Sequence, residues 1–304
     1  MERRYNIVDR RIVEVQGVPA LVNVFINPNE SERKYLIDTL KLDDHTLNSA
    51  LDPDELSRLE FEPEHLALIY KRPKSHTYQD QFLFRVTSAG AYLFKDQLVV
   101  IISEDLPLFD SSMLFRSQTP AYVMLRLLFR SSFHFLEHLK IISSISDDLQ
   151  DKINRAMENR HLLNLFTLEK SLVYYLNSIN SNNVVIERLK LNTSKIGFSL
   201  NEQELLDDTL IENNQCYRQA EIYSNILASL MDARASIVSN NINVLMKTLN
   251  IITIAIMVPT FIVSAFSMNV DIPLQRHPFA FWIIMGMALI SVLGFIYSWR
   301  RMKW

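Results

Sequence analysis

The sequence predicts an α+β cytoplasmic domain that is followed by long helices and a C-terminal hairpin of two transmembrane helices. Two runs of 21 residues near the C-terminus, 248–268 and 278–298, carry no charge. Residues 121–258 contain no proline and a single glycine, Gly197, so little in that stretch would interrupt a helix. The first 110 residues instead alternate short apolar runs with turn residues, which is typical of strands.

The first domain is expected to span residues 1–115. Its helical signals are Asn29 followed by Glu32, a capping box that would open a helix through Lys41, and a second short helix from Thr46 to Ala50. The expected strands are the apolar, β-rich runs at 20–26, 65–70, 82–86, 92–94 and 98–102.

Three long helices are expected next, over about 118–157, 160–192 and 200–268. Residues 116–200 form a helical region, in which the polar run 180–183 could loosen the helix that contains it. The third helix would be about 100 Å long at ~1.5 Å per residue, and a helix of that length needs partners along it.

The two uncharged runs are expected to cross a membrane. Each would span about 31 Å, close to the ~30 Å hydrocarbon core of a bilayer. Lys247 precedes the first run and a basic tail, 299–304, follows the second, whereas the loop 269–277 carries one acid and one arginine. Positive charges favour the cytoplasmic side, so both termini are predicted to be cytoplasmic, in a cell (inner) membrane. The charged N-terminus lacks the apolar region of a signal peptide.

Composition argues against several classes of function. The net charge of −3 gives no basic field for nucleic acid, and five glycines cannot build a phosphate loop, so no organic cofactor is expected. Cys216 is the single cysteine. His134, Glu137 and His138 match a metalloprotease pattern, but no third ligand is identifiable, and the chain is predicted not to be an enzyme.

The segment 201–247 is expected to form an acidic stalk helix. It holds seven carboxylates, among them Asp207 and Asp208, and only two arginines. These acids could form a solvated face. They could also form a divalent-cation site between neighbouring subunits, because such cations prefer carboxylate and water oxygens.

A stripe of polar side chains runs along one side of the helix expected over the first uncharged run. At about 100° per residue its polar side chains fall within an arc of roughly 100°. Such a stripe must face protein or water: it could hydrogen-bond to packed helices, or line a pore formed by several chains. The residues on or beside the stripe are Asn243, Met246, Leu249, Asn250, Thr253, Met257, Thr260 and Ser264.

The stretch from Asn243 to Asn269 resembles the CorA-type divalent-metal transporters. In that family the first membrane span ends in Gly-Met-Asn; Met268 and Asn269 match this signature, and Ser267 replaces the glycine. The basic tail after Ser298 is similar to the family's own, and the segment 23–28 resembles the start of its cytoplasmic domain. The resemblance covers nearly the whole chain.

The resemblance implies a funnel-shaped homopentamer in a lipid bilayer. Its pore would carry Mg²⁺, with Co²⁺ and Ni²⁺ as further substrates, and would be gated by cytoplasmic metal at Asp207 or Asp208. The family signature places the outer mouth at 267–269, and Asp271, the one acid of the loop, is a further candidate metal ligand. Two alternatives stay open: a Zn²⁺ transporter of the ZntB type, and a membrane scaffold that conducts no ions.

Overall fold

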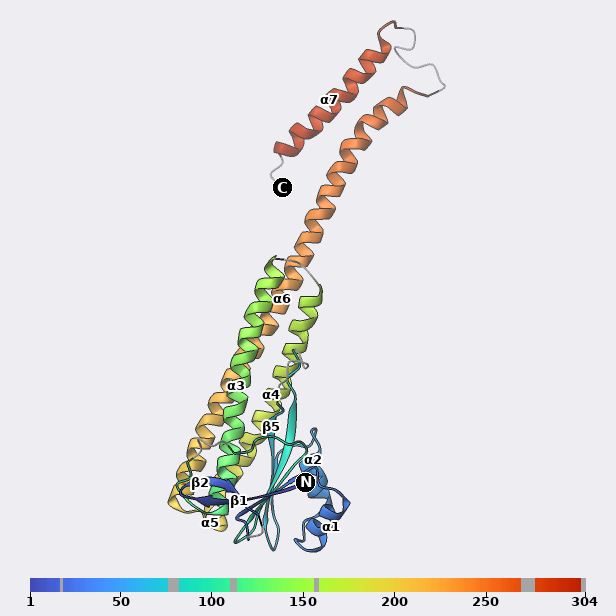
Figure 1. The fold of residues 1–304 in the computed structure, drawn as a ribbon. Helices are drawn as coiled ribbons and strands as arrows, with labels where there is room; N and C mark the ends of the chain where they lie inside the picture. Colours follow the sequence, from blue (N-terminus) through green and yellow to red (C-terminus); the bar gives the residue numbers. More distant parts are fainter. Residues whose placement is uncertain (17–18, 76–81, 110–113, 156–158, 269–276, 302–304) are drawn as a thin grey trace. The chain divides into compact units, whose positions relative to one another are not determined.

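The computed structural model of the chain forms two compact units, Met1–Met231 and Asp232–Trp304 (Figure 1). Each unit is described by itself below. The structure describes residues 1–16, 19–75, 82–109, 114–155, 159–268 and 277–301.

The first unit is built on one seven-stranded sheet, with strand order β2-β1-β3-β7-β6-β5-β4. Neighbouring strands are antiparallel except β3 and β7, which pair in parallel with Val24 opposite Val100. The strands are β1 (Glu2–Val8), β2 (Arg11–Glu14), β3 (Val22–Ile26), β4 (Arg58–Phe61), β5 (Leu66–Pro73), β6 (Val86–Leu93) and β7 (Leu98–Ile102).

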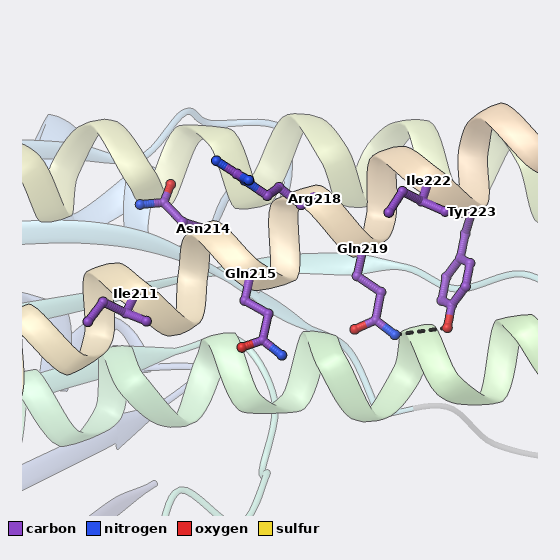
Figure 2. A pocket seen from close by; sticks show the side chains of 7 residues that line it. All are labelled: Ile211, Asn214, Gln215, Arg218, Gln219, Ile222 and Tyr223. Carbon is purple, nitrogen blue, oxygen red and sulfur yellow. Dashed lines mark hydrogen bonds between the residues drawn. The ribbon is translucent and has the colours of Figure 1, made fainter.

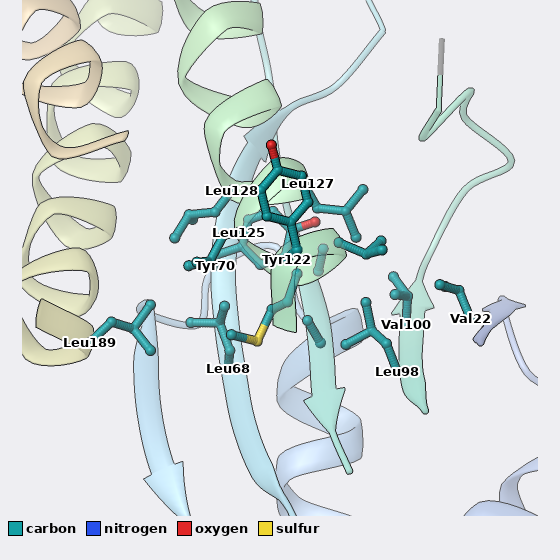
Figure 3. Close-up of a cluster of buried hydrophobic side chains, with 14 of the residues drawn as sticks. Val22, Leu68, Tyr70, Leu98, Val100, Tyr122, Leu125, Leu127, Leu128 and Leu189 are labelled. Carbon is teal, nitrogen blue, oxygen red and sulfur yellow. The ribbon is translucent and has the colours of Figure 1, made fainter. Parts of the chain in front are cut away.

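Helices cover both faces of this sheet. Because side chains alternate along a strand, Leu68 packs in the cluster beneath the long helices whereas Ile69 packs beneath the short ones. Figure 3 shows the first of these clusters, in which Tyr122 and Leu127 of α3 lie over Leu68 and Val100. Both faces are therefore apolar, which explains why β5 and β7 are buried at every position.

The short helices are α1 (Glu30–Asp38) and α2 (Asp44–Leu51). The Asn29 side chain accepts a hydrogen bond from the Glu32 N–H at 2.9 Å, and Glu32 caps in return, as predicted. The expected continuation to Lys41 is wrong: the helix ends at Asp38, and Lys41 has a left-handed backbone with φ 57°.

The long helices are α3 (Pro120–Arg155), α4 (Asn159–Leu191) and α6 (Leu200–Ala265), with the short α5 (Thr193–Ile196) before α6. They confirm the three helices predicted from the lack of glycine and proline. The third helix ends at Ala265, three residues before its predicted end. Within the first unit the three pack around a second apolar cluster that includes Phe135, Tyr175 and the fully buried Cys216 (Figure 1).

Two of the predicted strands, 82–86 and 92–94, are wrong as separate elements. Residues 83–85 form no strand, and β6 runs without interruption from Val86 to Leu93. Gly90 lies in its middle, where a Cβ atom would come within 2.6 Å of the Ala50 Cβ on α2. This glycine permits close packing of a helix on the strand rather than a turn.

The polar run 180–183 fastens α4 to the sheet instead of loosening it. The Asn182 Oδ1 accepts hydrogen bonds from the Lys71 N–H at 2.7 Å and the Ser57 hydroxyl at 2.8 Å. Its Nδ2 donates to the Lys71 carbonyl at 2.8 Å, and the Asn182 side chain is fully buried.

The second unit contains the C-terminal part of α6 and α7 (Ala280–Arg301). The most apolar 18-residue windows of α6 and α7 have mean hydropathies of 1.9 and 2.2, and 0% and 6% of these windows are buried. A core helix of a soluble protein would be mostly buried. The low burial therefore favours the prediction that both helices lie in a membrane.

Candidate functional site: the polar stripe of α6

The polar stripe lies opposite the partly covered side of α6. Between Asn250 and Ser264, all stripe residues are exposed, whereas the half-buried positions are Ile251, Ala255, Val258, Pro259 and Ile262. At about 100° per residue, the centres of these two sets are roughly 180° apart. The stripe thus occupies the side of the helix that no described residue of the second unit covers.

Two hydroxyls of the stripe are oriented by their own helix. The Thr253 hydroxyl donates to the Leu249 carbonyl at 2.8 Å, and the Thr260 hydroxyl donates to the Ile256 carbonyl at 2.6 Å. A hydroxyl that donates to the helix keeps its lone pairs for another donor, such as a water molecule. Thr253 and Thr260 therefore present fixed acceptors along the stripe.

The helix ends just before the expected outer mouth. After Ala265, the Ser267 hydroxyl donates to the Ser264 carbonyl at 2.9 Å, which satisfies one of the last carbonyls of α6. Ser267 and Met268 are exposed. Asn269 and Asp271, which the sequence places at the mouth and in the loop, lie outside the described residues.

The acids at the start of α6 have three different environments. Glu202 is buried, accepts a hydrogen bond from the Ser199 N–H at 2.6 Å, and is bonded by the Thr119 hydroxyl, so it acts as a structural cap. Asp207 is exposed and pairs with Lys190 of its own chain at 2.9 Å. Asp208 is also exposed, and it lines a cleft of the first unit. Among the described residues, no three His, Cys, Asp or Glu side chains are grouped as they would be to hold a metal ion.

A groove of about 650 Å³ runs along α6 farther from its start (Figure 2). Figure 2 shows Gln215 and Gln219 on one flank, where the Gln219 Nε2 donates to the Tyr223 hydroxyl at 2.8 Å. Ile211 and Ile222, both lining residues, are 64% and 55% exposed. Exposed isoleucines beside amides and an arginine are typical of a surface that packs against another protein chain.

The metalloprotease pattern on α3 does not form a metal site in the described structure. His134 Nε2 lies 3.7 Å from the Glu137 carboxylate, and His138 Nδ1 bonds the Tyr175 hydroxyl at 2.7 Å. Burial, together with the positive charges of Arg130 and Arg72, lowers the pKa of His134 to about 4. His138 belongs to the packing between α3 and α4, whereas His134 lies near Tyr70 and Arg72 of β5.

Comparison with known proteins identifies the family. The family model for the CorA-like Mg²⁺ transporter protein matches residues 24–301, which include strands β4 to β7 of the sheet, the long helices and both apolar helices. The chain belongs to the CorA-like Mg²⁺ transporter family. This confirms the resemblance read from the segment that ends at Met268 and Asn269.

Individual members of the family support this assignment. The chain is similar to the cobalt/magnesium transport protein CorA of Methanocaldococcus jannaschii, with 25% identity over 288 residues, 91% of this chain and 89% of the relative. The solved structure of the complete CorA magnesium transporter from that organism matches with a TM-score of 0.84 at 21% identity and covers 100% of this chain and 98% of its own. The ZntB cytoplasmic domain from Vibrio parahaemolyticus matches with a TM-score of 0.60 at 12% identity, covering 79% and 98%. The CorA-like fold therefore extends over the soluble domain, the long helix and the two apolar helices.

Sequence reasoning missed one charged feature of the first unit. Arg10 lies in a turn far from Arg116 and Arg126 in the sequence, yet all three line the same cleft as Asp208. No sequence motif predicts this grouping of arginines, because only the fold brings their segments together.

Proposed function

We propose that this family member is a homopentameric transporter of divalent cations, with Mg²⁺ as its main substrate and Co²⁺ and Ni²⁺ as further ones. Its pore would be lined by the polar stripe of α6, one stripe from each chain. The observation that carries this proposal is the position of the stripe, opposite the partly covered side of an otherwise apolar helix. Polar side chains in hydrocarbon must face protein or water, and five stripes around an axis would enclose water.

The groove on α6 supports assembly with further copies of the chain. Its exposed Ile211 and Ile222 would be buried by a neighbouring α6, and Arg218 offers a partner for the neighbour's acids. A helix of 66 residues also needs partners along its length. A stable monomer or dimer in mass measurements on the detergent-solubilised protein would contradict the pore.

The stripe suits a hydrated divalent ion. Mg²⁺ sheds its waters reluctantly, so neutral acceptors that bind those waters would pass it more readily than a tight ring of carboxylates. The hydroxyls of Thr253 and Thr260 and the amide of Asn250 are such acceptors. Leu249 and Met257 would narrow the pore into a constriction that closes by dewetting. A potential of ~100 mV would drive a divalent ion with about 4.6 kcal/mol.

The orientation follows from the charges that flank the two apolar helices. Lys247 and the basic tail would place both termini in the cytoplasm of a cell whose inner membrane holds the protein. The first unit would then lie on the cytoplasmic side, where its acids can respond to the internal Mg²⁺ concentration.

Regulation would act through Asp207 and Asp208, with Mg²⁺ bound between subunits. Bound ions would cancel repulsion between carboxylates and stabilise a closed state, and their loss would shift the population toward the open one. The double variant Asp207→Asn, Asp208→Asn should weaken inhibition of flux by internal Mg²⁺. Because Asp207 already pairs with Lys190, Asp208→Asn alone should account for most of the change. Unchanged inhibition in the double variant would exclude this mode of control.

Asn269 is proposed as the selective residue of the outer mouth, together with Ser267 and Met268. Its amide oxygen would accept a hydrogen bond from a water on the ion, so Asn269→Ala should abolish or greatly reduce Mg²⁺ flux into liposomes while the pentamer stays intact. If Asn269 only caps the helix, Asn269→Gly should conduct like the parent. Parent-like flux in both variants would make the assignment wrong.

The same flux assay separates the rival functions. Liposomes loaded with dyes for Mg²⁺, Co²⁺ and Zn²⁺ should report Mg²⁺ entry first. Preferred entry of Zn²⁺ would favour a transporter of the ZntB type, whose cytoplasmic fold this chain shares. Absence of flux for all three ions from an intact oligomer would favour a membrane scaffold.

A further inference from the structure

A cleft of about 430 Å³ in the first unit brings together side chains of both charges. Arg10 reaches it from the turn between β1 and β2, and Arg126 from α3. Arg116 comes from the segment before α3, and Glu204 and Asp208 come from the start of α6. Neither the proposed pore nor the assembly of subunits requires these arginines.

Arg10 is held at this cleft by its own backbone. Its backbone has φ 62°, in the left-handed region that residues other than glycine rarely adopt. Its carbonyl accepts a hydrogen bond from the Phe115 N–H at 2.9 Å, and its Nε donates to the Phe115 carbonyl at 3.3 Å. These two bonds fix both the turn and the base of the guanidinium group.

Arg126 contributes a buried donor. Its Nε is shielded from solvent and has no hydrogen-bond partner within the described parts of the chain, although its guanidinium lies over the Phe129 ring at 5.4 Å. Nor do the described residues place a carboxylate within 4.0 Å of the nitrogens of Arg10, Arg116 or Arg126. The cleft therefore gathers three guanidinium groups whose charge no described carboxylate within 4.0 Å balances, and an anion in the cleft would balance it.

We propose that this cleft binds a phosphate-bearing anion, and that it prefers the anion in complex with a divalent cation. Guanidinium groups match phosphate oxygens in geometry and charge. Glu204 and Asp208 would repel a bare polyphosphate, but a divalent ion between carboxylate and phosphate turns that repulsion into attraction. The cleft has the size of a small-ligand site.

Calorimetry on the full-length protein in detergent, with inorganic pyrophosphate in the presence of Mg²⁺ as the probe, tests the proposal. The parent should bind pyrophosphate saturably. Arg126→Gln should raise the dissociation constant about ten- to a hundredfold, the worth of a charge-assisted hydrogen bond. Arg116→Gln, at an exposed position, should raise it in the same direction. Arg11→Gln removes an exposed arginine of β2 outside the cleft and should leave it unchanged. Either of two results would overturn the proposal: no saturable binding by the parent, or a dissociation constant in both Arg126→Gln and Arg116→Gln that equals the parent's.

Two further arms define the ligand. Without Mg²⁺ the parent should bind pyrophosphate more weakly, and Glu204→Gln should reduce that difference whereas Glu221→Gln, outside the cleft, should not. Equal affinity with and without Mg²⁺ would overturn the preference for the metal complex. ADP binding more tightly than pyrophosphate would identify a nucleotide as the source of the phosphate, and the reverse order would identify an inorganic one; either order supports the cleft as an anion site.

Discussion

Asn182 offers the sharpest test of how the helical layer is attached to the sheet. Its side chain makes three hydrogen bonds, two of them to the backbone of Lys71 in β5 and one to the Ser57 hydroxyl. Asn182→Ala removes all three. The Lys71 carbonyl keeps a partner, the Ser131 hydroxyl at 2.6 Å, but the Lys71 N–H and the Ser57 hydroxyl lose theirs in a buried place.

The cost can be worked out from those groups. Each buried polar group left without a partner costs about 1–3 kcal/mol, and the small cavity left by the amide adds to this. We therefore expect Asn182→Ala to destabilise the first unit by about 3–5 kcal/mol. For a domain of this size, ~1 kcal/mol shifts the unfolding temperature by about 2–4 °C, so the midpoint should fall by about 6–20 °C.

Thermal unfolding of the detergent-solubilised protein measures this shift. Asn180→Ala is the matched control, because Asn180 lies on the same helix and is exposed, so its midpoint should stay within about 2 °C of the parent. If Asn182→Ala and Asn180→Ala unfold at the same temperature, the hydrogen bonds to Lys71 do not hold α4 on the sheet.

Two other changes test the packing and the charges of the first unit. Gly90→Ala should destabilise it by about 1–3 kcal/mol, because the new Cβ would lie 2.6 Å from that of Ala50; an unfolding midpoint equal to the parent's would contradict this close packing. His134 has a pKa lowered from 6.5 to about 4 by burial and by Arg130 and Arg72, so the unfolded chain takes up its proton at a higher pH than the folded one. Stability should therefore fall as the pH decreases from about 6.5 to about 4, and His134→Gln should flatten that part of a midpoint-against-pH curve; an identical curve would refute the assignment.

The long helices could be predicted from the sequence, whereas the edge hairpin of the sheet could not. The absence of glycine and proline leaves few places for α3, α4 and α6 to stop. The hairpin of β1 and β2, in contrast, turns at Asp9 and Arg10, with φ 48° and 62°, where an Asn-Gly pair would be the usual signal. Its strands are rich in charged residues and only half-buried, so they lack the apolar pattern that predicts a strand.

Gly90 shows that a glycine has more than one structural use. In a sequence it indicates a turn, yet in β6 it allows α2 to approach the strand closely. Only the tertiary structure distinguishes the two. The same holds for Asn182, whose polar character suggests a surface position until the backbone of Lys71 is placed beside it.

The candidate site was predictable only as far as a single helix defines it. The spacing of Asn250, Thr253, Met257, Thr260 and Ser264 fixes one face of α6, and the structure places the half-buried positions on the other. An ion-binding ring, however, repeats each residue by symmetry. The residues of one chain therefore carry the chemistry of the ring but not its diameter, on which selectivity depends.

The environment of Cys216 makes this chain suitable for chemical labelling. Its thiol is fully buried in the helical layer, and burial raises its pKa, so it stays protonated and out of reach of maleimides and methanethiosulfonates. It is the one cysteine in the sequence. A cysteine introduced at Thr253 or Thr260 would thus be the one reactive thiol of the folded protein. Its rate of modification, with and without Mg²⁺, would report whether water reaches that position of the stripe, and no native cysteine would first have to be removed.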